Sequence, residues 1–180
     1  NSSKTEERTG IDQATVMFAY HTPLAGDKKS YSAVALNALT AGGMSSRLFS
    51  EIREKRNLAY AVKGEANTNK TFAYNLIYVG TMKENVEKVK ELILEEFEKV
   101  ADSLGEGELN LIKEQLIGNY KISMEDSQQQ MVNLLAHEMH GDAKSFYNFE
   151  KEIKKVKLED VKKLASNVKK DYSFFALVPK

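Results

Sequence analysis

Residues 39–60 read LTAGGMSSRLFSEIREKRNLAY, which combines the end of a buried helix, a Gly-Gly break, a short second helix and the start of a strand. Gly42 and Gly43 permit backbone angles that other residues avoid, so they predict a sharp turn. Ser45 and Ser46 follow, and serine hydroxyls commonly accept hydrogen bonds from the free amides of a helix start. We therefore expect a new helix to begin directly after the two serines.

The charged residues of this second helix differ in whether the helix itself offers them a partner. Arg47 and Lys55 each lie four residues from Glu51, the spacing of helical ion pairs. Arg53 lies at the edge of the apolar stripe and has no acid three or four residues away. Arg56 also lacks such an acid, but it falls at the helix end, where a cation suits the free carbonyls. Arg53 is therefore the arginine that local pairing does not explain.

Tyr60 follows Arg53 by seven residues and lies near the start of a predicted strand. A tyrosine in that place can be half buried with its hydroxyl directed outward. Two interpretations remain open from the spacing. In the structural one, which spacing alone favours, Arg53 extends its guanidinium to water while Tyr60 is a core aromatic. In the functional one, both side chains serve a site.

The run GGMSSRLF…IREKRNLAY, residues 42–60, resembles the signature of the second, non-zinc domain of the pitrilysin or insulinase-like zinc metallopeptidases. The mitochondrial processing peptidase belongs to the same group, and the resemblance extends from about Gln13 to Pro179. In this family the first domain carries an inverted zinc motif, His-x-x-Glu-His. The second domain closes over the substrate and contributes an arginine and a tyrosine seven residues apart, positions that match Arg53 and Tyr60 here.

The resemblance implies that this chain is the C-terminal half of an insulinase-like zinc endopeptidase and is inactive alone. The zinc and the general-base glutamate would come from a homologous partner domain, in the same chain or in a separate subunit. The substrate would be a peptide or an unfolded polypeptide. The site residues implied are Arg53 and Tyr60 as catalytic hydrogen-bond donors, with Gly42, Gly43, Ser45 and Ser46 forming the cavity wall or binding substrate.

Two other functions compete with this one. The same fold serves non-catalytic structural or regulatory subunits, such as the core proteins of a respiratory complex, although the intact Arg53 and Tyr60 favour the catalytic interpretation. A free-standing hydrolase that uses Ser45, Ser46 or His137 has little support, because no triad-like set can be assembled from the sequence.

Composition narrows the remaining classes of function. The 180 residues suit one domain, and 26 basic residues balance 26 acidic ones, so charge gives no case for binding nucleic acid or an anionic membrane. The absence of cysteine excludes disulfides and thiolate zinc sites. No apolar run approaches the roughly 20 residues that a membrane helix needs, and no signal peptide is recognisable. These features predict a cytoplasmic protein that does not bind membranes.

The order of predicted elements favours an α+β fold, with a mixed, largely antiparallel sheet and helices packed mainly on one face. Residues 1–10 are polar and predict a linker or disordered tail, which leaves 11–180 as a single domain. A polar run at 125–130 predicts a break or kink between two helices. The expected strands are 13–20, 58–63, 71–81 and 172–178, and the expected helices include 84–101, one starting near 108, 145–153 and 158–168.

The segment His137-Glu-Met-His140 is the one place that invites a metal interpretation. It matches neither His-Glu-x-x-His nor His-x-x-Glu-His, because the second histidine comes at i+3. A zinc site also needs a third protein ligand, and the sequence offers none nearby. We therefore expect no metal site in this chain.

Overall fold

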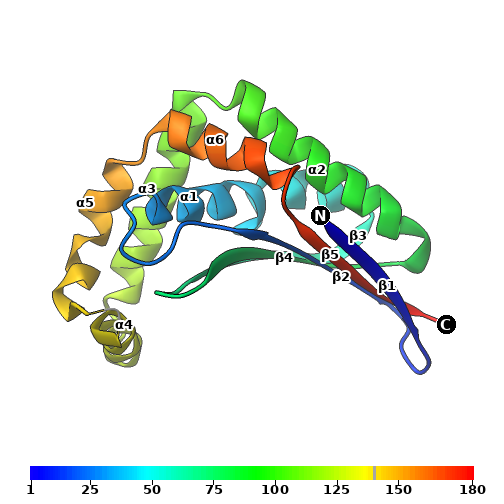
Figure 1. Cartoon of the computed structure of the whole chain (residues 1–180), viewed down its shortest axis with the longest axis horizontal. Helices are drawn as coiled ribbons and strands as arrows, with labels where there is room; N and C mark the ends of the chain where they lie inside the picture. The colour runs from blue at the N-terminus through cyan, green and yellow to red at the C-terminus, as the bar shows by residue number, and fades with distance from the viewer. Residues whose placement is uncertain (140) are drawn as a thin grey trace.

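The structure is a computed structural model and describes residues 1–139 and 141–180. Within these residues five strands form one sheet in the order β1-β5-β2-β4-β3, and α1, α2 and α6 lie over one of its faces (Figure 1). β5 pairs with β1 in parallel, and the other neighbouring strands are antiparallel. The predicted α+β architecture is confirmed.

The elements have the following bounds in chain order: β1 Ser2–Arg8, β2 Ala14–His21, α1 Ser30–Ala41, η1 Phe49–Glu54, β3 Ala59–Thr68, β4 Ala73–Thr81, η2 Lys83–Asn85, α2 Val86–Ser103, α3 Glu106–Ser123, α4 Ser127–Met139, η3 Ala143–Asn148, α5 Phe149–Lys154, α6 Leu158–Val168 and β5 Ser173–Pro179.

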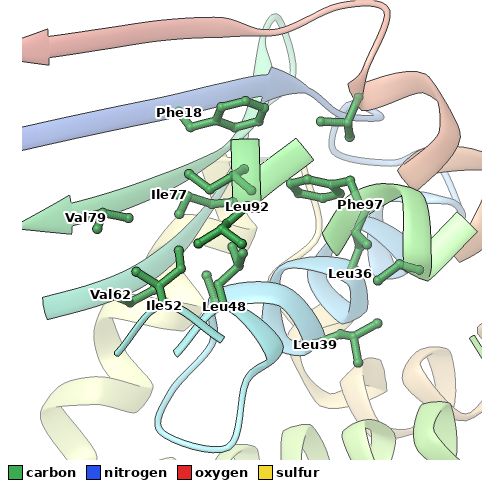
Figure 2. Packing of buried hydrophobic residues seen from close by; sticks show 14 of the residues in the cluster. Phe18, Leu36, Leu39, Leu48, Ile52, Val62, Ile77, Val79, Leu92 and Phe97 are labelled. Carbon is green, nitrogen blue, oxygen red and sulfur yellow. The ribbon is translucent and has the colours of Figure 1, made fainter. Parts of the chain in front are cut away.

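The hydrophobic core lies between the sheet and its helix layer (Figure 2). Alternate residues of β2 and β4 face the helices, among them Phe18 and Ile77, because successive side chains of a strand point to opposite faces. From the helix side, Phe97 of α2 stacks on Phe18 with ring centroids 6.0 Å apart. Burying an aromatic or aliphatic side chain of this size contributes roughly 1.5–3 kcal/mol. The apolar residues of α2 at helical spacing, Val86, Val89, Leu92, Ile93, Phe97 and Val100, are all buried.

The expectation of a disordered N-terminal tail is wrong for Ser2–Arg8, which forms strand β1. All seven residues are exposed, so the sequence carries no apolar alternation to mark the strand. What orders it is backbone pairing with β5, from Ser2 opposite Ser173 to Arg8 opposite Pro179. Such pairing needs no apolar side chains when the strand lies at a sheet edge. β5 is thereby an interior strand, as its apolar sequence indicates.

The predicted break between two helices is confirmed, but it is shorter than the polar run. α3 ends at Ser123 and α4 begins at Ser127. Asp126 starts the second helix, since its Oδ1 accepts hydrogen bonds from the amides of Gln128 at 2.8 Å and Gln129 at 3.2 Å. This is the geometry of a helix N-cap, which allows the polar residues that follow to be helical.

Candidate functional site

The two glycines of the central stretch are required for two different reasons. Gly42 ends α1, and a Cβ built on it would lie 2.4 Å from the Cα of Ala38, so no side chain fits there. Gly43 has φ +131°, a conformation that residues with a side chain rarely adopt. The predicted sharp turn is present, and it directs the chain from α1 into η1.

The two serines after the turn contact the protein differently from the expectation. Ser46 is buried, and its Oγ donates a 2.6 Å hydrogen bond back to the carbonyl of Gly43 instead of accepting from a helix amide. Ser45 Oγ lies 3.5 Å from Oε1 of Gln115 on α3. Both serines line a surface pocket together with Glu96 of α2. Ser46 therefore closes the turn on itself, and Ser45 faces α3.

The short second helix is a π-helix, in which the amide of Lys55 donates to the carbonyl of Ser50, five residues earlier. The predicted pair of Glu51 and Lys55 is confirmed. Arg56 has no acid three or four residues away, but the wider turn of a π-helix brings residues i and i+5 together, so Arg56 pairs with the Glu51 carboxylate. As expected for a cation at a helix end, it also donates to a backbone carbonyl, that of Glu51 at 3.0 Å. Hydrogen bonds from Lys55 and then Arg56 lower the pKa of Glu51.

Arg47 pairs across the fold and not with Glu51. Its Nε and Nη2 donate to the two carboxylate oxygens of Glu108 on α3, at 2.7 and 2.5 Å. Its Nη1 lies 3.9 Å from Glu96 of α2, which is only 3% exposed and also pairs with Lys99. The hydrogen bond with Glu108 raises the pKa of Arg47. The cluster of Arg47, Glu96, Lys99 and Glu108 therefore connects the residues just before η1 to both α2 and α3.

Sequence reasoning missed this cluster, although one signal for it was present. Glu96 lies four residues after Leu92 and three after Ile93, both on the buried face of α2. A carboxylate in that position must be paired, since an isolated buried charge is strongly unfavourable.

Arg53 is exposed, and its guanidinium lies over the ring of Phe49, 4.9 Å from the ring centroid. Within the described residues no carboxylate forms an ion pair with it. A cation–π contact of this kind orients a guanidinium while leaving its N–H donors directed to other groups. Phe49 is itself buried, so the stacking partner is held in place by the core.

The chain between Arg53 and Tyr60 makes a tight turn through Asn57. Asn57 has φ +52°, a left-handed conformation that asparagine tolerates better than most residues, and its amide donates to the carbonyl of Arg53. β3 then begins at Ala59 and packs against η1.

Tyr60 occupies a β-bulge. The register of β3 against β4 shifts between Ala59, opposite Thr81, and Ala61, opposite Gly80. Tyr60 is thus the extra residue, and its side chain is 48% exposed. A bulge redirects the side chain that it carries, and bulges are frequent next to active sites. Arg53 and Tyr60 are therefore exposed hydrogen-bond donors on two elements that pack together.

The histidine segment gives no metal site among the residues that the structure describes, where no group of three or more His, Cys, Asp and Glu side chains could hold an ion. His137 faces η3, and its Nδ1 lies 2.8 Å from Oγ of Ser145. His140, the other histidine of the sequence motif, lies outside the described residues. None of the helices described has both the length and the apolar composition to span a bilayer.

Known proteins are similar to this chain in sequence and in fold. The uncharacterized zinc protease YmxG of Bacillus subtilis is 28% identical over 182 residues, which cover 99% of this chain and 44% of YmxG. A protease from Helicobacter pylori has the same fold, with a TM-score of 0.88 at 21% identity over 98% of this chain and 44% of its own. A peptidase M16 inactive domain from Pseudomonas fluorescens has a TM-score of 0.79 at 24% identity. The match covers 99% of this chain and 44% of that chain.

The chain spans less than half the length of the curated relatives that it matches. A family model described as the peptidase M16 inactive domain matches residues 1–116, more than half of the chain. The glycine turn, Arg53 and Tyr60 all lie inside the matched region. The chain belongs to the peptidase M16 family and corresponds to its inactive domain.

Proposed function

We propose that this chain is the non-zinc half of an M16 zinc endopeptidase and that Arg53 and Tyr60 donate hydrogen bonds to the peptide being cleaved. The names of its relatives as zinc proteases and the match to the family's inactive domain support the pairing with a zinc-bearing domain. Zinc held by that partner domain would activate a water molecule and polarise the scissile carbonyl. This chain's part is to enclose the peptide and to stabilise charge on it.

The observation on which the proposal rests is the exposure and orientation of the Arg53 guanidinium. Its side chain is exposed and oriented by Phe49, and no ion pair within the described residues neutralises it. An arginine held in this way retains donors for a carbonyl or an oxyanion. Tyr60 adds a phenol whose exposure results from the bulge. In a closed, water-poor cavity, donors fixed in advance lower the energy of a developing oxyanion.

The test needs the zinc-bearing domain together with this chain, as the full-length protein or as a complex. Tyr60→Phe removes one hydroxyl and keeps the ring, so we expect kcat/KM on an unfolded peptide to fall by about two to three powers of ten. Arg53→Ala should reduce it similarly and can raise KM if the guanidinium also holds ground-state substrate. Melting temperatures should stay near the wild-type value.

Tyr147→Phe is the matched control, because Tyr147 is a similarly exposed tyrosine (54%) on η3. It should leave kcat/KM unchanged. A non-catalytic subunit would give the opposite pattern, with small stability losses and no kinetic effect. Wild-type kinetics in both Tyr60→Phe and Arg53→Ala would remove the catalytic role proposed for the pair.

A further inference from the structure

Helix α4 carries an apolar face that points away from the rest of the fold. Met131, Val132, Leu135 and Met139 are 63%, 49%, 61% and 71% exposed. Their spacing of i, i+1, i+4 and i+8 places them on one side of the helix. None of the α4 residues that the structure describes is buried. We call these four residues the α4 stripe.

The fold holds α4 through its opposite side. Leu134 and His137 are partly buried on that side, and His137 hydrogen-bonds Ser145 of η3, the element that α4 contacts most. Asp126 caps its N-terminus. In Figure 1 the helix lies at one end of the molecule, apart from the layer formed by α1, α2 and α6. The position of α4 is thus fixed without use of the α4 stripe.

The composition of α4 favours a protein over a membrane as the surface that covers the α4 stripe. Its sequence, SQQQMVNLLAHEM, contains no lysine or arginine, whereas helices that lie on membranes are rich in both on their polar face. Protein interfaces are depleted of charge at their centre and enriched in methionine. Two of the four stripe residues are methionines, whose flexible side chains adapt to an opposing surface.

The family supplies a partner of the required kind, since the chain spans under half the length of its curated relatives and corresponds to the domain without zinc. We propose that the α4 stripe is the surface on which this chain docks against its zinc-bearing homologous domain. This inference rests on the pairing in the proposed function and not on the roles of Arg53 and Tyr60. In the assembled protein the four side chains are buried against the partner domain.

The absence of cysteine allows a direct test by thiol labelling. Leu135→Cys places a single thiol in the α4 stripe. Leu111→Cys is the matched control, a leucine 66% exposed on the neighbouring helix α3. Labelling by a maleimide is followed by mass spectrometry of the peptide that carries the thiol, first on this chain alone and then with the zinc-bearing domain present. We expect at least tenfold slower labelling at position 135 in the assembly and an unchanged rate at 111.

Three other labelling results would contradict docking of the α4 stripe on the zinc-bearing domain. Equal rates at position 135 with and without the zinc-bearing domain would show that the α4 stripe stays exposed. Protection in this chain alone, increasing with its concentration, would assign the stripe to a second copy. Protection by vesicles of phosphatidylglycerol would assign it to lipid. Leu135→Glu gives a second measurement, since it should weaken assembly at least tenfold while Leu111→Glu should not.

The labelling result is independent of turnover, so it separates this inference from the proposed function. Protection of position 135 in an assembly whose activity is insensitive to Tyr60→Phe would keep the docking surface and remove the catalytic role. Loss of activity in Tyr60→Phe with an unprotected position 135 would keep the catalytic role and remove the docking surface.

Discussion

Helices α2 and α4 both carry an apolar face, yet they use it differently. α2 buries Val89, Leu92, Ile93 and Phe97 against the sheet, whereas none of the described residues of α4 is buried. The difference lies in where the two helices are placed. α2 follows β4 after only the short η2 and lies over the sheet, whereas α4 follows α3, which packs against α1 and α5 (Figure 1). An apolar face thus indicates that a helix will be covered, and the surrounding fold decides what covers it.

The largest difference in stability between substitutions on the two helices should come from truncating Phe97 of α2. Its ring is fully buried and contacts Phe18 at 6.0 Å and Tyr20 at 5.1 Å between centroids. Phe97→Ala should therefore lower the free energy of unfolding by about 3–5 kcal/mol, measured by urea denaturation. A loss below about 1 kcal/mol would mean that α2 is no better packed than α4.

A smaller change in the free energy of unfolding should appear at high pH, through Tyr20, which packs against Phe97. Burial raises the pKa of Tyr20 well above its ordinary value of 10, so the folded protein keeps the phenol proton that the unfolded chain loses above pH 10. Because the folded state then binds more protons, the stability from Tyr20 is fully present below pH 10 and decreases as pH rises.

Between pH 9 and 11 the wild type should lose about 1.4 kcal/mol more than Tyr20→Phe, in parallel urea titrations at both pH values. The variant controls for the lysines and other tyrosines that titrate in the same range. Identical slopes in both proteins would show that Tyr20 is hydrated in the folded state and that the α2 side of the core is open to water.

The smallest change in the free energy of unfolding should come from substitutions in the α4 stripe. Leu135→Ala in this chain alone should change the free energy of unfolding by less than about 0.5 kcal/mol, the usual range for exposed positions. The same urea titration used for Phe97→Ala measures it, so the two values compare directly. A loss of 2 kcal/mol or more would reveal that Leu135 packs within this chain, and the contrast between the helices would disappear.

The elements that the sequence predicted are those whose pattern is local. The apolar residues of α2 and α6 recur at helical spacing, and their predicted limits agree closely with the structure. β1 was missed because its stability comes from pairing with β5, about 170 residues away, and its own residues are all polar. Local periodicity cannot reveal a strand that is ordered entirely by a distant partner.

For the candidate site, too, some features could be predicted from local sequence and others depend on the tertiary fold. The motif placed Arg53 and Tyr60 seven residues apart, and the structure adds the features that local spacing could not supply. These are the π-helical turn, which pairs Glu51 with Arg56, and the bulge at Tyr60. The partners of Arg47 also depend on how α2 and α3 pack around the turn. The sequence named the candidate residues, and the tertiary fold determines how their side chains are oriented.

The polar strand β1 also gives one margin of the sheet a charged character. Both outer strands carry charges, Lys4 and Glu6 on β1 and Lys63 and Glu65 on β3. A sixth strand added at either margin would have to lie beside these charged side chains, which discourages edge-to-edge growth. The residues that were expected to form a loose tail therefore place charges along this edge, a feature that disfavours the pairing of a further strand.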